Sequence, residues 1–159
     1  MPSTYPTCPH MSDLLASTLA GLYQQGEHTK PTPYEEILFG LWLSKQFDSI
    51  PHPVRFSKDE VSPELLIDTY NRTGDLLISS ANNQSVWSDA QNLMFRAVHD
   101  WHHIKAKAGF DLIGEIQAYG EAAKVAPKSI HWILFSEIVL QAATAIHTGT
   151  FPVQKLVKL

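Results

Sequence analysis

The sequence predicts an all-α fold, a single-domain helical bundle of five or more helices. Apolar residues recur at the three-to-four-residue spacing of amphipathic helices in several long segments. Short connections that contain proline or glycine separate these segments, and strand signals are few. Helices joined by short connections bury their apolar faces against their neighbours, which favours a bundle.

The N-terminal half contains three of the expected helices. The first covers residues 12–25, and the second covers residues 33–47 after a capping box, with a proline at its first position. The third covers residues 62–70 and also begins with a serine followed by a proline. Residues 54–56 and 76–78 are short apolar stretches, which allow a minor β-hairpin.

Three consecutive helices are expected in the C-terminal half, at residues 88–107, 112–125 and 129–147. Ser88 and Gln91 have the spacing of a capping box, and neither proline nor glycine follows before residue 107. Only a few residues separate the first two helices, so we expect them to form an antiparallel hairpin.

The composition is typical of one globular domain, which we place at residues 11–159 after a flexible leader at residues 1–10. The chain has 159 residues, of which 44% are hydrophobic, and a net charge of −4. It has no basic block to follow a phosphate backbone, so bulk nucleic-acid binding is not expected. A single cysteine, Cys8, excludes an internal disulfide, and the first ten residues do not resemble a secretory signal. These features predict a cytoplasmic protein.

The most apolar run, residues 130–146, is expected to be a buried central helix and not a membrane span. It carries the polar residues Glu137 and Gln141 near its centre. It is also shorter than the roughly 20 residues that a bilayer requires. We therefore expect no membrane contact.

The helix at residues 88–107 ends in H-D-W-H-H, which places three histidines and an aspartate within residues 99–103. His99 and His103 lie one turn apart on the same helix face. This spacing allows two imidazoles of one helix to bind a divalent metal. Asp100 is a candidate catalytic carboxylate. His102 is expected to orient one of the metal ligands without binding the metal itself. Solvated histidines on a surface helix are the alternative.

Two carboxylates on the following helices are candidates to complete the metal site. Glu115 lies in the first turn of its helix, where Gly114 and Ala118 allow another helix to approach. A favourable interaction with the helix dipole would also explain an acid there. Glu137 is an isolated charge in an apolar helix, with Gln141 one turn later as its expected support. A buried carboxylate must be paired or bound to a metal, whereas a solvent-facing stripe would need no partner.

Known histidine patterns match this segment only in part. H-D-x-x-H differs from the zincin motif H-E-x-x-H by a shorter acid, so Asp100 reaches less far toward a metal-bound water. H-x-x-H-H is also the histidine box of membrane desaturases, which need spanning segments. His99 and Asp100 resemble the paired ligands of HD-domain phosphohydrolases, and His52 is a candidate for the upstream histidine of that family. The later aspartate of that family is missing, because no aspartate follows Asp111.

Four blocks between residues 95 and 155 resemble an uncharacterised family of bacterial and phage proteins. The blocks are F-R-A-V-H-D-W-H-H, G-F-D-L-I-G-E, F-S-E-I-V-L-Q and G-T-F-P-V-Q-K. The family has no assigned activity, so the resemblance supports the site and not a reaction. It implies a phage-related protein in the cytoplasm of a bacterium or an infected host. It points to the residues already selected, which are His99, Asp100, His103, Glu115, Glu137 and Gln141.

The sequence therefore predicts a Zn, Fe or Mn site with His99, His103, Glu115 and Glu137 as ligands. The first interpretation is a metal-dependent hydrolase of an unknown small-molecule substrate, with Asp100 or Glu137 as the catalytic base. The second is a mono- or di-iron oxidase or oxygenase, although the E-x-x-H motifs of di-iron bundles are missing. The third is a non-enzymatic, virion-associated binding protein. A homo-oligomer is compatible with all three.

Overall fold

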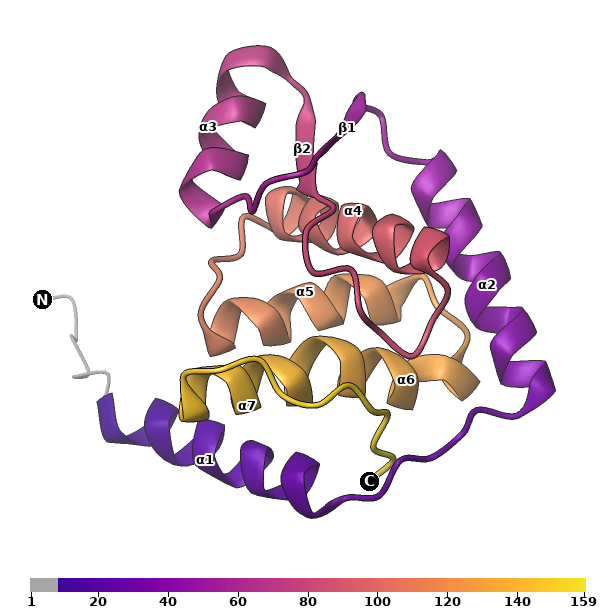
Figure 1. Ribbon diagram of the computed structural model, residues 1–159, viewed down its shortest axis with the longest axis vertical. Coiled ribbons are helices and arrows are strands. Elements are labelled where there is room, and N and C mark those ends of the chain that lie inside the picture. The colour runs from indigo at the N-terminus through magenta and orange to yellow at the C-terminus, as the bar shows by residue number, and fades with distance from the viewer. Residues whose placement is uncertain (1–8) are drawn as a thin grey trace, which may run out of the picture.

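The computed structural model describes residues 9–159 as a mostly helical protein with one small sheet (Figure 1). The predicted helical fold is confirmed. Most of the expected leader, residues 1–8, lies outside the described residues, whereas Pro9 and His10 already belong to the first helix. The helices that precede the long C-terminal run are α1 (Pro9–Gln25), α2 (Pro33–Asp48), α3 (Pro63–Thr73), α4 (Asp89–Ala106) and α5 (Leu112–Lys124).

The helices are packed around two central elements, which are α5 and the helical run Lys128–Thr148. Helices α4 and α5 lie side by side, and the helical run Lys128–Thr148 packs against the other side of α5 (Figure 1). Helix α1 packs along the end of this run, and α2 crosses the start of α4. The main core lies between these helices and includes fully buried Phe39, Leu43 and Ile133.

The small sheet differs from the hairpin expected from the sequence. Strands β1 (Val54–Ser57) and β2 (Leu76–Ser79) are parallel, with Val54 opposite Leu76. Helix α3 connects β1 to β2 and returns the chain to the end of the sheet where β1 began. Two parallel strands require such a crossover connection. The predicted β-hairpin was therefore wrong, and the predicted all-α fold class did not include this parallel sheet.

The C-terminal helical run contains a π-helical turn that the sequence did not predict. A short 3₁₀ turn (Lys128–Ile130) leads into α6 (His131–Phe135), the π-turn (Ser136–Leu140) and α7 (Gln141–Thr148). The Gln141 amide donates to the Ser136 carbonyl, five residues earlier. The run is long and apolar enough to cross a membrane, but 56% of its most apolar 18-residue window is buried inside the protein. It is the central helix of the core.

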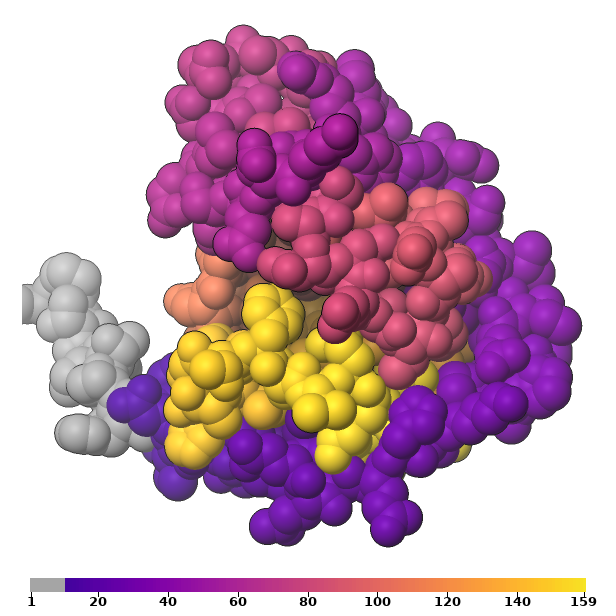
Figure 2. Space-filling view, viewed as in Figure 1, coloured from indigo at the N-terminus to yellow at the C-terminus, as the bar shows by residue number. Residues whose placement is uncertain are grey.

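Residues 153–158, named here the C-terminal strap, dock back onto the helices. Leu156 and Val157 are buried. The Val157 amide donates to Ser136 Oγ over 2.9 Å, and Tyr23 Oη donates to the Val153 carbonyl over 2.6 Å. Figure 2 shows the yellow C-terminal residues beside the pink connection between β2 and α4. The strap thus ties α1 to the π-turn.

Candidate metal centre

Two caps shape the connection between α4 and α5. Lys107 is the C-cap of α4 and takes the left-handed conformation with φ of 52°. Asp111 is the N-cap of α5, and its side chain accepts the Gly114 amide over 2.8 Å. The short connection between these caps brings the first turn of α5 against the last turns of α4.

Gly114 allows an unusually close approach within this connection. A Cβ atom at Gly114 would lie 1.6 Å from the carbonyl oxygen of Gly109. The sequence predicted that Gly114 makes room for another helix, but the structure shows that it makes room for the α4–α5 connection itself. The next residue, Glu115, is therefore turned toward α4.

Three side chains meet at this junction and can hold a metal ion. The ligand atoms offered by His99, His103 and Glu115 all lie within 4.8 Å of one another. Glu115 Oε2 is 3.0 Å from His99 Nε2 and 3.2 Å from His103 Nε2, and the two nitrogens are 3.1 Å apart. Two imidazoles and one carboxylate therefore converge on one point.

The backbone selects the tautomer of His103. His103 Nδ1 lies 3.2 Å from the carbonyl oxygen of Ala108, which can only accept a hydrogen bond. Nδ1 must therefore carry a proton, and in a neutral ring the lone pair on Nε2 faces His99 and Glu115. A metal-binding histidine usually has this arrangement, with its second nitrogen donating to a carbonyl or carboxylate.

Aromatic rings hold both imidazoles in place. Phe110 stacks on His103 with ring centroids 4.2 Å apart, and the ring of Phe95 is parallel to that of His99 at 6.1 Å. The His103 side chain is completely buried, whereas 20% of the His99 side chain is exposed. His99 is therefore the more exposed of the two imidazoles.

The electrostatics of the group favour a positive charge. Burial alone would raise the pKa of Glu115, but hydrogen bonds from the imidazoles of His103 and His99 in their protonated forms outweigh burial and lower this pKa to about 2. Burial opposes protonation of His99, yet Glu115 raises the pKa of this imidazole by its hydrogen bond and its charge. A carboxylate and imidazole lone pairs at these distances are stabilised by a cation, either a proton or a metal.

Glu137, the fourth expected ligand, lies outside this group. It sits in the π-turn, and its Oε1 accepts a hydrogen bond from Gln141 Nε2 over 3.1 Å. Burial raises the pKa of Glu137 to about 7, although Gln141, the charge of His99 and the indole of Trp87 each lower it. The carboxylate of Glu137 therefore interacts with the charge of His99. Its position in a π-turn is also notable, because π-turns occur frequently at functional sites.

Asp100 and His102 take different positions from the three converging residues. Burial raises the pKa of Asp100 to about 6, while the charges of His99 and His103 oppose this change. His102 is buried beside Trp42, and burial lowers its pKa to about 4. Neither residue belongs to the converging group, so their expected catalytic and supporting roles stay predictions.

The sequence did not identify three parts of this site. The Ala108 carbonyl and the Phe110 ring belong to the connection after α4, and no side-chain pattern marks the carbonyl. Trp87 precedes the Ser88 cap, and its buried indole nitrogen is close enough to lower the pKa of Glu137 but forms no close hydrogen bond with any of the described residues. A tryptophan directly before a helix cap is a weak signal, because such residues often only pack against the helix.

Comparisons of the chain with protein-family models, curated proteins and solved structures give no significant match.

Proposed function

We propose that this protein is a divalent-metal-dependent hydrolase whose ion is bound by His99, His103 and Glu115. The convergence of their three ligand atoms supports the proposal most directly. Catalytic zinc sites often have three protein ligands, including two histidines and a glutamate, and leave a position for water or substrate. In this proposal the open position lies on the side of His99, the more exposed of the two imidazoles.

A divalent ion held by His99, His103 and Glu115 would lower the pKa of a coordinated water. Glu137 would accept the proton of that water, because it is a carboxylate near His99 that belongs to no ion pair of the described residues. Gln141 orients Glu137 by its hydrogen bond. Asp100 follows His99 in the chain, and its negative charge favours positive charge at the His99 imidazole. The same charge would favour a metal cation bound there. The substrate is a small molecule with a hydrolysable ester, amide or phosphoester bond.

Hydrolysis is tested with zinc- and manganese-loaded protein and p-nitrophenyl acetate, p-nitrophenyl phosphate and bis-p-nitrophenyl phosphate. We expect turnover of at least one substrate to be lost in His99→Ala and in Glu137→Gln. Glu137→Gln should still bind the metal, because Glu137 is not in the converging group. Full activity of Glu137→Gln would contradict its assignment as the base, and equal activity of His99→Ala would contradict the hydrolase.

The ligand set also fits a second candidate, a mononuclear non-haem iron oxygenase. The three ligand atoms lie 3.0, 3.1 and 3.2 Å apart, which is close enough for them to share one face of an octahedral ion. Two histidines and one carboxylate on such a face are typical of iron(II) oxygenases.

The two candidates differ in their response to oxygen. Anaerobic protein loaded with iron(II) should change its absorbance on exposure to air if it is an oxygenase, and this change should be lost in His99→Ala. An unchanged spectrum, together with ester or phosphoester turnover by the zinc form, would exclude the oxygenase.

A further inference from the structure

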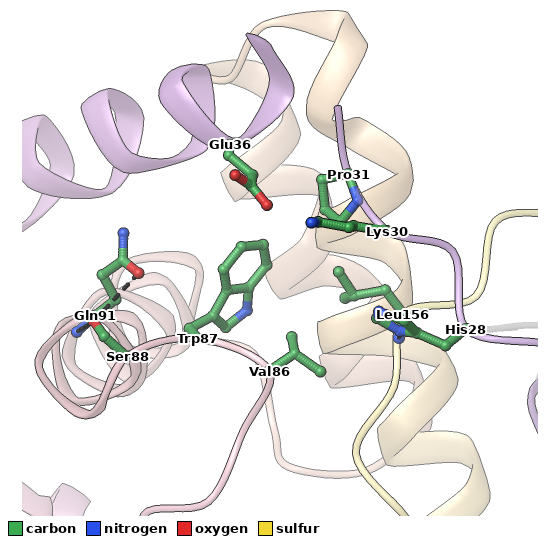
Figure 3. Close-up of a pocket in the computed structure, with 9 residues that line it drawn as sticks. All are labelled: His28, Lys30, Pro31, Glu36, Val86, Trp87, Ser88, Gln91 and Leu156. Atoms are coloured by element: carbon green, nitrogen blue, oxygen red, sulfur yellow. Dashed lines mark hydrogen bonds between the residues drawn. The ribbon is translucent and has the colours of Figure 1, made fainter. Parts of the chain in front are cut away.

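A cleft whose lining includes none of the three candidate metal ligands lies beside the Trp87 indole. Its volume is about 380 Å³, and the α1–α2 connection, the first turn of α2, the start of α4 and the C-terminal strap enclose it (Figure 3). Neither histidine of the metal centre lines it, and neither does Glu115. The lining residues on which binding depends are His28, Lys30, Pro31, Glu36, Trp87 and Leu156.

The floor of the cleft is apolar and fixed. The indole of Trp87 stacks on Phe39 with ring centroids 4.2 Å apart and an angle of 19° between the rings. Pro31 and Leu156 are buried beside it. Leu156 is anchored on both sides of its peptide, because its carbonyl accepts the Thr29 amide and its amide donates to His28. An aromatic or aliphatic group of a ligand would find a preformed surface there.

Opposite charges border this floor. The side chains of Lys30 and Glu36 both extend toward the space over the Trp87 indole (Figure 3). Neither forms an ion pair with another residue of the described chain. His28 Nδ1 accepts the Leu156 amide over 3.0 Å, so its neutral ring carries the proton on Nε2 and can donate a hydrogen bond. The α1–α2 connection therefore offers a cation and a donor, and α2 offers a carboxylate.

We propose that this cleft binds a free α-amino acid with an apolar side chain. Its carboxylate lies at Lys30 and His28, its ammonium group lies at Glu36, and its side chain packs on Trp87. An apolar surface with a few polar groups that fix orientation is the usual design of a small-molecule site, and a volume above about 300 Å³ is sufficient for one. A ligand with only one charge would leave either Lys30 or Glu36 without a partner. This proposal does not depend on the metal centre.

The charge requirement is tested by calorimetric titration with three probes of the same apolar group. These are L-phenylalanine, phenylacetate without the amine, and 2-phenylethylamine without the carboxylate. We expect L-phenylalanine to bind and both single-charge probes to bind at least about fivefold more weakly, as the loss of one partly exposed ion pair implies. Equal affinity for all three probes, or no binding of L-phenylalanine, would overturn the proposal.

Variants then place the ligand in this cleft. Lys30→Met and Glu36→Gln should each weaken L-phenylalanine binding by about fivefold. Both side chains are exposed, so these variants should keep the wild-type circular dichroism spectrum. Lys45→Met, an exposed lysine in the last turn of α2, is the matched control and should bind normally. Unchanged affinity in both cleft variants would overturn the assignment, as would equal weakening in the control.

Discussion

Two buried polar clusters of the molecule satisfy their hydrogen bonds in different ways. At the C-terminal strap each donor meets an acceptor, because the Val157 amide donates to Ser136 Oγ and Tyr23 Oη donates to the Val153 carbonyl. At the candidate metal centre three atoms that can accept, from His99, His103 and Glu115, converge on one point. The strap is complete with neutral groups, whereas the centre contains a buried carboxylate charge that a proton or a metal ion can balance.

This difference separates the roles of the two clusters. A buried polar network that is satisfied by its own donors and acceptors holds a fold together. A convergence of acceptors costs stability unless a proton or a metal occupies it. Metal should therefore change the properties of the α4–α5 junction and leave the strap unaffected. Substitutions in the strap should have the opposite pattern.

The largest expected effect comes from adding a side chain at Gly114, where the backbone of Gly109 lies in close contact. Gly114→Ala would place Cβ 1.6 Å from the Gly109 carbonyl oxygen, so the start of α5 must move. We expect a loss of about 3 kcal/mol in the free energy of unfolding, measured by urea denaturation, and a loss of metal binding. Gly120→Ala, also in α5, meets nothing within 4 Å and should be neutral or stabilising. Similar stability of the two variants would contradict the close approach.

The next effect concerns pH in metal-free protein. Burial raises the pKa of Glu137 from 4.5 to about 7, so the folded state binds this proton more tightly than the unfolded state. The resulting stability is present below pH 4.5 and is lost as the pH rises through about 7. Glu137→Gln should remove about 2 kcal/mol of this dependence between pH 5 and pH 8.

Asp100 contributes a smaller dependence of the same sign, because burial raises its pKa to about 6. Some decline of stability with pH should therefore remain in Glu137→Gln. Thermal unfolding across this pH range measures both effects, and a Glu137→Gln profile identical to that of the wild type would contradict the burial of a protonated carboxyl group.

A smaller effect is expected at the strap. Ser136→Ala leaves the buried Val157 amide without an acceptor and should cost about 1–2 kcal/mol of unfolding free energy. Ser136→Thr keeps the hydroxyl and should recover part of this loss. Neither variant should change the affinity for metal, since Ser136 is outside the converging group. A large fall in metal affinity for Ser136→Ala would show that the two clusters are coupled.

Much of the helical fold followed from local sequence patterns. The caps at Thr32, Ser62, Ser88 and Asp111 are observed as hydrogen-bonded N-caps. The meeting of His99, His103 and Glu115 could be anticipated, because two residues four apart share a helix face and a short connection brings the next helix alongside.

The remaining features depend on contacts between distant residues. The parallel pairing of β1 and β2 depends on the path of α3, which no local pattern determines. The π-turn that carries Glu137 also contains Ser136, which is bonded to the strap 21 residues later. An α-helical repeat placed Glu137 on the same face as Gln141, but it did not reveal the extra residue in the turn. Glu137 lies in this π-turn and outside the group of His99, His103 and Glu115, whereas the sequence predicted an ordinary α-helix there with Glu137 as a ligand.

The central claim is that His99, His103 and Glu115 bind a divalent metal. Its most direct test is calorimetric titration of chelator-treated protein with Zn²⁺, comparing the wild type with His99→Ala and with His147→Ala, an exposed histidine at the end of α7. We predict one bound ion per chain in the wild type and in His147→Ala, and an affinity at least about 100-fold lower in His99→Ala. No binding by the wild type, or equal binding by His99→Ala, would contradict the claim.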